Sequence, residues 1–92
     1  MKIEVISLLN SYQEKLYFVK IGYKGNEFTY DSSIAKLLNI SLAEYHVILK
    51  DYGGYCRYDD EQIYFYNRNA IERMVSGYLE NRLVMAALVE NL

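Results

Sequence analysis

The chain has no proline and no tryptophan, and it contains one cysteine, Cys56, and one histidine, His46. A single cysteine excludes an internal disulfide and is typical of a protein held in a reducing cytoplasm. One cysteine and one histidine cannot build a structural zinc site without several carboxylates, and neither C-x-x-C nor H-x-x-x-H spacing occurs. We therefore expect no metal, no cofactor and a cytoplasmic location.

Long apolar runs and basic clusters are also scarce. No apolar stretch approaches the ~20 residues that a membrane span requires. The N-terminal MKIEVISLLN has a short apolar stretch broken by Glu4 and Ser7, so we interpret it as part of the fold and not as a signal peptide. The net charge of −2 argues against a general polyanion binder, because phosphate backbones need a dense basic patch. Without linkers or repeats, residues 1–92 are expected to form one domain.

Catalytic motifs are missing in the same way. The glycines fit neither G-x-G-x-x-G nor P-loop spacing. A pair of His46 and Cys56 would still need an orienting group and an oxyanion site, which no residue pattern marks. The run Asp59-Asp60-Glu61 lacks the alternating oxygen ligands of a calcium loop and is interpreted as a solvated hairpin tip. The chain is not expected to be an enzyme.

The N-terminal third predicts an antiparallel β meander. Residues 2–9 begin with an alternation in which Ile3 and Val5 lie on one side and Lys2 and Glu4 on the other, which favours a strand over a competing helix at 4–13. Residues 15–23 are rich in β-branched and aromatic types and predict a second strand. Gly25-Asn26 predicts a two-residue hairpin turn, and residues 27–30 return as a third strand. Eleven tyrosines, with many residues of AT-rich codons, indicate a low-GC bacterial or phage genome.

The central part predicts two short helices followed by a hairpin. Asp31 or Ser32 is expected to cap the first helix, and Asn39 suits the left-handed position that ends it. Ser41, with Glu44 three residues later, forms a capping box for a second helix over 42–52. Gly53-Gly54 would stop that helix, and two strands, 55–58 and 62–66, would complete the hairpin.

A long final helix is predicted to begin after Asn67 or Asn69 and to reach about residue 90. Its first half is amphipathic, whereas the second half, LVMAALVENL, is apolar nearly all round. Such a helix either fills the core or packs against another chain. The second interpretation predicts a homodimer through Leu83, Ala87 and Leu88.

The stretch IAKLLNISLAEYHVILKDYGGYCRYDDEQIYFYN resembles winged helix-turn-helix proteins. It is similar in style to small phage and mobile-element proteins, and acidic phage proteins of this size include anti-CRISPR inhibitors. The resemblance implies an α+β fold with a winged-helix-like centre and a long C-terminal helix. Proteins of this type usually bind DNA, yet residues 31–67 contain three basic residues against six acidic ones.

We therefore expect a non-enzymatic, phage-encoded interaction protein that binds and inhibits a bacterial protein or nucleoprotein complex. Its partner would meet an acidic and aromatic surface, since exposed tyrosines beside carboxylates suit protein interfaces. The expected contact residues are Glu44, Asp51, Tyr55, Tyr58, Asp59, Asp60 and Glu61. The alternative is a dimeric winged-helix transcription regulator that binds DNA, although the charge disfavours it. Its expected DNA contacts are Lys36, His46, Lys50 and Arg57.

Overall fold

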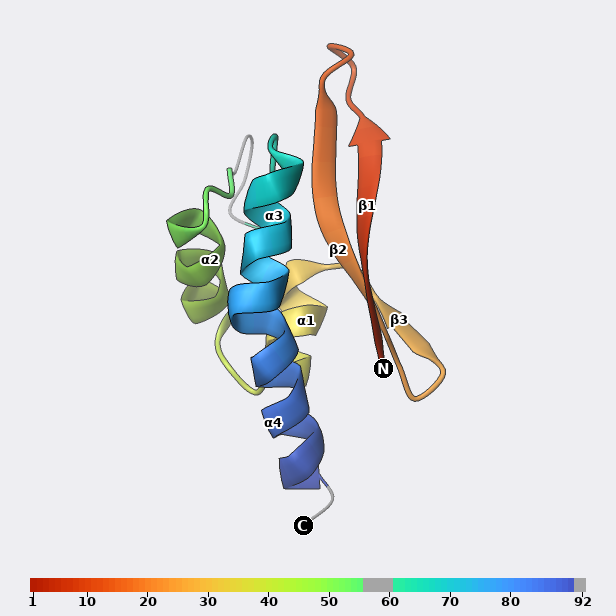
Figure 1. Cartoon of the computed structure of the whole chain (residues 1–92), viewed down its shortest axis with the longest axis vertical. Helices are drawn as coiled ribbons and strands as arrows, with labels where there is room; N and C mark the ends of the chain where they lie inside the picture. Colours follow the sequence, from red (N-terminus) through yellow and green to blue (C-terminus); the bar gives the residue numbers. More distant parts are fainter. Residues whose placement is uncertain (56–60, 91–92) are drawn as a thin grey trace.

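The chain has a mixed α+β fold in which the helices lie on one side of a three-stranded antiparallel sheet (Figure 1). The computed structural model describes the backbone of residues 1–55 and 61–90 and the side chains of residues 1–55 and 61–86. The expected α+β class is confirmed. Within the described residues, no helix is long and apolar enough to cross a membrane.

The sheet contains β1 (Lys2–Leu9), β2 (Lys15–Tyr23) and β3 (Asn26–Phe28) in the order β1-β2-β3. The strand prediction for residues 2–9 is therefore confirmed over the helix at 4–13. The register runs without interruption from Lys2 opposite Gly22 to Leu9 opposite Lys15. Because side chains alternate along a strand, the apolar residues of β1 and β2 form one row that faces the helices and another that faces away.

The turn between β2 and β3 lies one residue earlier than the sequence predicts. Tyr23 pairs with Asn26, so the two loop residues are Lys24 and Gly25, with φ of 50° and 78°. Two successive positive φ values match the hairpin turns that follow strand twist, and Gly25 occupies one of them without steric cost. The third strand also ends at Phe28 and not at residue 30.

The two central helices are α1 (Asp31–Leu37) and α2 (Leu42–Asp51). Asn39 has the predicted left-handed φ of 60°, and Ser41 caps α2 by accepting a 3.1 Å hydrogen bond from the Glu44 N–H. The predicted cap of α1 is wrong: the N-cap residue is Tyr30, whose own side chain makes no capping hydrogen bond. Asp31 is instead buried and bonds to residues distant in sequence.

The C-terminal third is one continuous helical rod made of α3 (Arg68–Met74), the wider π-helical turn η1 (Val75–Leu79) and α4 (Glu80–Glu90). Asn67 caps it, accepting hydrogen bonds from the N–H groups of Asn69 at 2.8 Å and Ala70 at 3.4 Å. The predicted long helix is thus confirmed. Gly77 sits in η1 where a Cβ atom would approach the Tyr52 hydroxyl to 2.8 Å.

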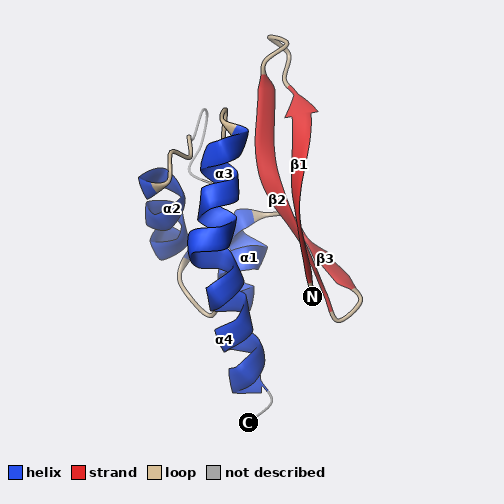
Figure 2. Cartoon of the chain, viewed as in Figure 1, coloured by secondary structure: helices blue, strands red, loops and turns tan. Residues whose placement is uncertain are grey.

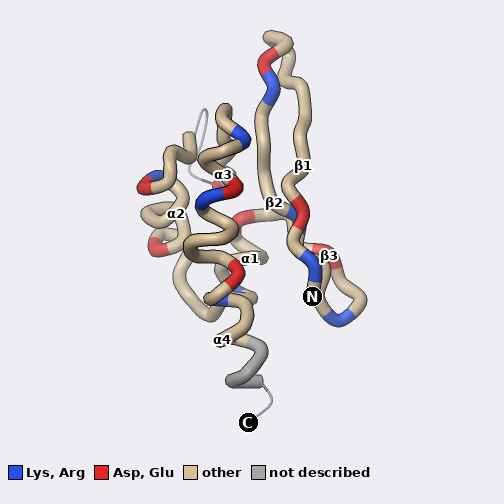
Figure 3. Tube along the Cα trace, in the orientation of Figure 1, with Lys and Arg blue, Asp and Glu red and all other residues tan. Residues whose placement is uncertain are grey.

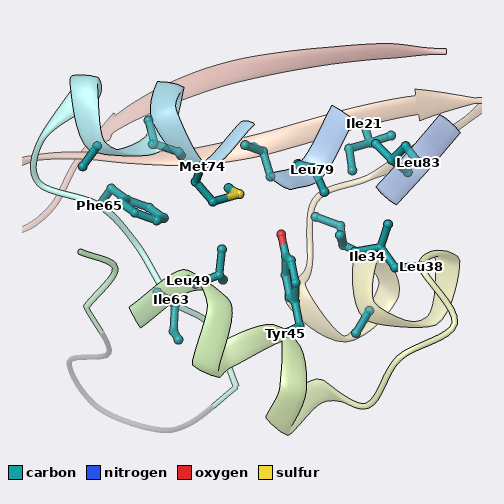
Figure 4. Close-up of a cluster of buried hydrophobic side chains, with 14 residues drawn as sticks. Ile21, Ile34, Leu38, Tyr45, Leu49, Ile63, Phe65, Met74, Leu79 and Leu83 are labelled. Atoms are coloured by element: carbon teal, nitrogen blue, oxygen red, sulfur yellow. The ribbon is translucent and has the colours of Figure 1, made fainter. Parts of the chain in front are cut away.

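The core lies between the helix-facing side of the sheet and the helices (Figure 4). Tyr45 crosses it from α2, and its ring points toward Met74 and Leu79. The most deeply buried side chains are Tyr45, Phe65, Ile21, Ile34, Leu38, Leu49, Ile63, Ile71, Met74, Leu79 and Leu83. They come from every helix, from β2 and from the segment before α3, so these parts of the chain share one core.

The predicted two-stranded wing is not present as two strands in the described residues. Tyr55 and Tyr64 form an isolated antiparallel bridge, and Cys56 to Asp60 lie outside the described residues. The returning segment pairs with the sheet instead: Tyr17 N donates to Phe65 O at 2.7 Å, and Phe65 N donates to Tyr17 O at 2.9 Å. Backbone groups around Phe65 therefore bond to β2, which places this buried ring in the core.

Candidate functional site

The exposed face of α2 carries two carboxylates and one lysine around the apolar Val47. Glu44, Val47 and Asp51 are exposed and recur at the three- and four-residue spacing that aligns side chains on one helix face. Val47, between two carboxylates, is 58% exposed. Lys50 is the exposed cation on this helix (Figure 3). We call Glu44, Val47 and Asp51 the α2 stripe.

The His46 side chain lies on the opposite side of α2 from the α2 stripe and is buried. The expectation that it is exposed on the surface to bind DNA is therefore wrong. Its side chain is 8% exposed, and its Nε2 lies 3.0 Å from Oδ2 of Asp31, which is itself 4% exposed. The same oxygen accepts a 2.7 Å hydrogen bond from the Ile63 N–H. This Asp31–His46 clasp joins the start of α1, the middle of α2 and the segment that returns to β2.

Gln62 completes the connection at the surface of the clasp. Its Oε1 accepts a 2.9 Å hydrogen bond from the Asp31 N–H, and its Nε2 donates to Thr29 O at 3.2 Å. The free N–H groups at a helix start need such acceptors. The sequence-predicted cap of α1 is therefore replaced by a side chain about thirty residues away.

Burial controls the electrostatics of the clasp. Removal from water raises the pKa of Asp31 from 3.8 to about 6, while the hydrogen bond from Ile63 and the charge of His46 oppose this rise. Burial also raises the pKa of the Tyr45 hydroxyl well above its ordinary value, and the nearby Asp31 charge adds to the effect. The clasp therefore joins three segments of the fold through groups that are buried.

A shallow groove opens beside the clasp. One part has a volume of about 320 Å³ and the adjoining part about 200 Å³, and both are lined by Tyr30, Gln62 and Tyr64. The remaining lining residues are Leu8, Phe18, Thr29, Ser32, Leu42 and Glu61. We call this depression the tyrosine groove. Glu61 supplies its charge, and Tyr30 is the most accessible ring, being 69% exposed.

Aromatic side chains continue from the groove along the segment that pairs with β2. The Tyr64 ring meets Phe18 edge-on at 6.2 Å between centroids. The rings of Tyr55 and Tyr66 lie 5.4 Å apart and are 46% and 43% exposed. Amphipathic rings of this kind supply contact area at low entropic cost, which makes the region suitable for a protein partner.

The structure places four of the seven predicted contact residues on the surface. Glu44, Asp51, Tyr55 and Glu61 are exposed. Tyr58, Asp59 and Asp60 lie outside the described residues, as does Arg57 from the alternative set. Glu61 adjoins the tyrosine groove, while Glu44 and Asp51 share the α2 stripe.

The sequence reasoning missed Tyr30, Gln62 and Tyr64 as groove residues. Their polar and aromatic types indicate surface contact, but only the folded chain brings residue 30 beside residues 62 and 64.

Of the three predicted dimer residues, the structure describes the side chain of one. Leu83 is 2% exposed and belongs to the core of its own chain, so it is not available to a second copy. The side chains of Ala87 and Leu88 lie outside the described residues. Val84 and Met85, which are 52% and 54% exposed, are the apolar residues that α4 presents to solvent in its described part.

No group of His, Cys, Asp or Glu among the described residues is arranged to hold a metal ion. No protein-family model matches the chain, and no curated protein and no solved structure matches it either. The site is therefore interpreted from its own chemistry.

Proposed function

We propose that this chain is a non-enzymatic, phage-encoded interaction protein that binds and inhibits a bacterial protein or nucleoprotein complex, as anti-CRISPR inhibitors do. The observation that carries the proposal is the α2 stripe. In a helix-turn-helix the second helix is the one that enters the DNA major groove. Here that helix presents Glu44, Val47 and Asp51 to solvent and buries its histidine.

Charge favours a protein partner over DNA. The alternative function relied on Lys36, His46, Lys50 and Arg57, and the burial of His46 against Asp31 removes one of these cations from the surface. Lys36 and Lys50 remain exposed, but Lys50 shares its helix with two exposed carboxylates. Carboxylates beside a phosphate row are repelled even through screening salt, whereas a basic protein surface attracts them.

The tyrosine groove adds the aromatic contacts that such an interface needs. Tyrosines are frequent among the residues that contribute most to binding, and they act best beside a depression that excludes water. Tyr30 is highly exposed at the rim, with Tyr64 and Glu61 in the lining. A basic partner would meet Glu61 and the α2 stripe, while an apolar or aromatic side chain enters between Tyr30 and Tyr64.

The first test is capture of partners from a bacterial lysate by the wild type and by charge variants. The double change Glu44→Lys with Asp51→Lys should weaken retention of the specific partner at least about tenfold, because two attractive contacts become repulsive. Lys50→Glu is the matched control on the same helix and should retain that partner. Equal retention by all three proteins would show that the α2 stripe is not the contact surface.

The second test separates protein binding from DNA binding. A mobility-shift experiment with random duplex DNA at ~50 mM salt favours nonspecific contacts, because phosphate binding is strongest at low salt. The proposal expects no shift of the free duplex. A shift that the Lys36→Ala and Lys50→Ala changes abolish would support the transcription-regulator alternative instead.

A further inference from the structure

Within the described residues, the outer edge of β1 carries backbone groups without a hydrogen-bond partner. Tyr17 uses both its N–H and its C=O to bond Phe65, so these groups point away from β1. Because a residue in an antiparallel ladder directs both groups to one side, the residue opposite Tyr17, which is Ser7, directs its own groups outward. Because the direction of the backbone groups alternates from one residue to the next, the N–H and C=O groups of Ile3, Val5 and Leu9 also point outward.

Nothing in the described part of the chain bonds to these outward groups. In the upper half of Figures 1 and 2, α3 lies beside β2, and β1 lies on the side of β2 that is turned away from this helix. The usual protection of an edge strand is also weak, since β1 contains no proline and its register has no bulge. Its two charges, Lys2 and Glu4, lie 3.4 Å apart and pair with each other.

We propose that β1 pairs antiparallel with β1 of a second copy, so that two sheets join into one continuous sheet. The pairing that centres the two-fold axis on Ile6 sets Ile3 opposite Leu9 of the partner copy and Val5 opposite Ser7. Every outward N–H and C=O of these residues then finds a partner.

Side-chain chemistry favours this register over one that is centred on Glu4. With Ile6 on the axis, Ile6 meets its own copy, and Ile3 covers Leu9, which is 61% exposed in the single chain. Moving the axis to Glu4 would set two carboxylates opposite each other, which is unfavourable. The selected register therefore joins apolar residues across the axis and keeps like charges apart.

The face of the sheet turned away from the helices supports the same partner. Ile6 lies opposite Phe18, and Leu8 lies opposite Leu16, in cross-strand pairs on this face. Joining two copies at Ile6 extends the apolar row from Phe18 of one copy to Phe18 of the other. A second copy thus bonds to the outward N–H and C=O groups of β1 and also extends the row of apolar side chains that contains Phe18 and Ile6.

Proline at residue 7 tests the backbone contact. Ser7→Pro removes an outward N–H that has no partner within the described chain and leaves the bonds between β1 and β2 intact. Sedimentation equilibrium at about 100 µM protein should give the mass of two chains for the wild type and for the matched control Ser7→Ala. Ser7→Pro should weaken the dimer at least about tenfold, with the circular dichroism spectrum of the folded chain retained.

The residue on the axis allows a second test that does not depend on proline. Ile6→Arg alone should give single chains, because it sets two cations opposite each other, and Ile6→Glu alone should do the same. An equimolar mixture of the two variants should restore the two-chain mass. Only a residue that meets its own copy shows this rescue.

A wild type that stays a single chain up to about 1 mM would overturn the proposal. A dimer that survives Ser7→Pro but is lost in Met85→Glu would overturn it as well, and would place the contact on α4. A mixture of the Ile6 variants that remains monomeric would refute the register.

Discussion

The Asp31–His46 clasp gives the sharpest prediction about stability. Asp31→Ala removes the oxygen that accepts from the Ile63 N–H at 2.7 Å and from His46 Nε2 at 3.0 Å. Each buried donor left without an acceptor costs about 1–3 kcal/mol, and removal of the buried carboxylate offsets part of that cost. We therefore expect the free energy of unfolding to fall by about 3 kcal/mol, which is a large part of the roughly 5–15 kcal/mol of a typical domain.

Urea unfolding at pH 7, followed by circular dichroism, measures this loss. The corresponding fall in melting temperature should be roughly 12–24 °C for a chain of this size. Asp31→Asn is the matched control, because its amide oxygen still accepts from Ile63 N–H, and it should lose no more than about 1 kcal/mol. Amide exchange at Ile63 should accelerate in Asp31→Ala before global unfolding. An Asp31→Ala variant within about 0.5 kcal/mol of the wild type would refute the reasoning.

Three further changes test the same core. Because burial raises the pKa of Asp31 from 3.8 to about 6, its contribution to stability is complete below pH 3.8 and is lost as the pH rises through 6. The wild type should therefore gain roughly 1–3 kcal/mol relative to Asp31→Asn as the pH falls from 6 to 4, measured by urea unfolding at each pH. Gly54→Ala places a Cβ 2.6 Å from Ile63 Cγ2 and 2.8 Å from Leu49 O. This overpacking should lower the free energy of unfolding by about 2 kcal/mol in the same urea assay. An unchanged free energy of unfolding would contradict the close packing around Gly54. Tyr45→Phe removes a buried hydroxyl without a hydrogen-bond partner in the described residues, so the melting temperature should stay equal or rise, and a fall of several degrees would reveal an unrecognised partner.

Local patterns predicted most of the elements because their causes are local. Alternation of Ile3 and Val5 with charged neighbours marked β1, and the side chains of Ser41 and Asn67 capped the helices that follow them. These features depend on residues within one helical turn or one strand. The one-residue error at the β2–β3 turn has the same origin, because Asn and Gly both accept positive φ and only strand pairing decides which residues form the loop.

The candidate site was predicted less completely, for a physical reason. Glu44 and Asp51 were recognisable because an exposed helix face follows from spacing. The burial of His46 was not, since it depends on Asp31, and Asp31 resembled a helix cap in its local sequence. A carboxylate near a helix start has two competing uses, and the choice is made by the contacts that surround it.

The sequence by itself determined the order of β1, β2, β3 and the helices, the caps at Ser41 and Asn67, and the acidic net charge. Tertiary structure alone decided which polar groups were buried, that Phe65 bonds to β2, and that β1 keeps an open edge. The reason is that periodicity and capping arise between near neighbours, whereas burial and pairing depend on which distant segments share the core.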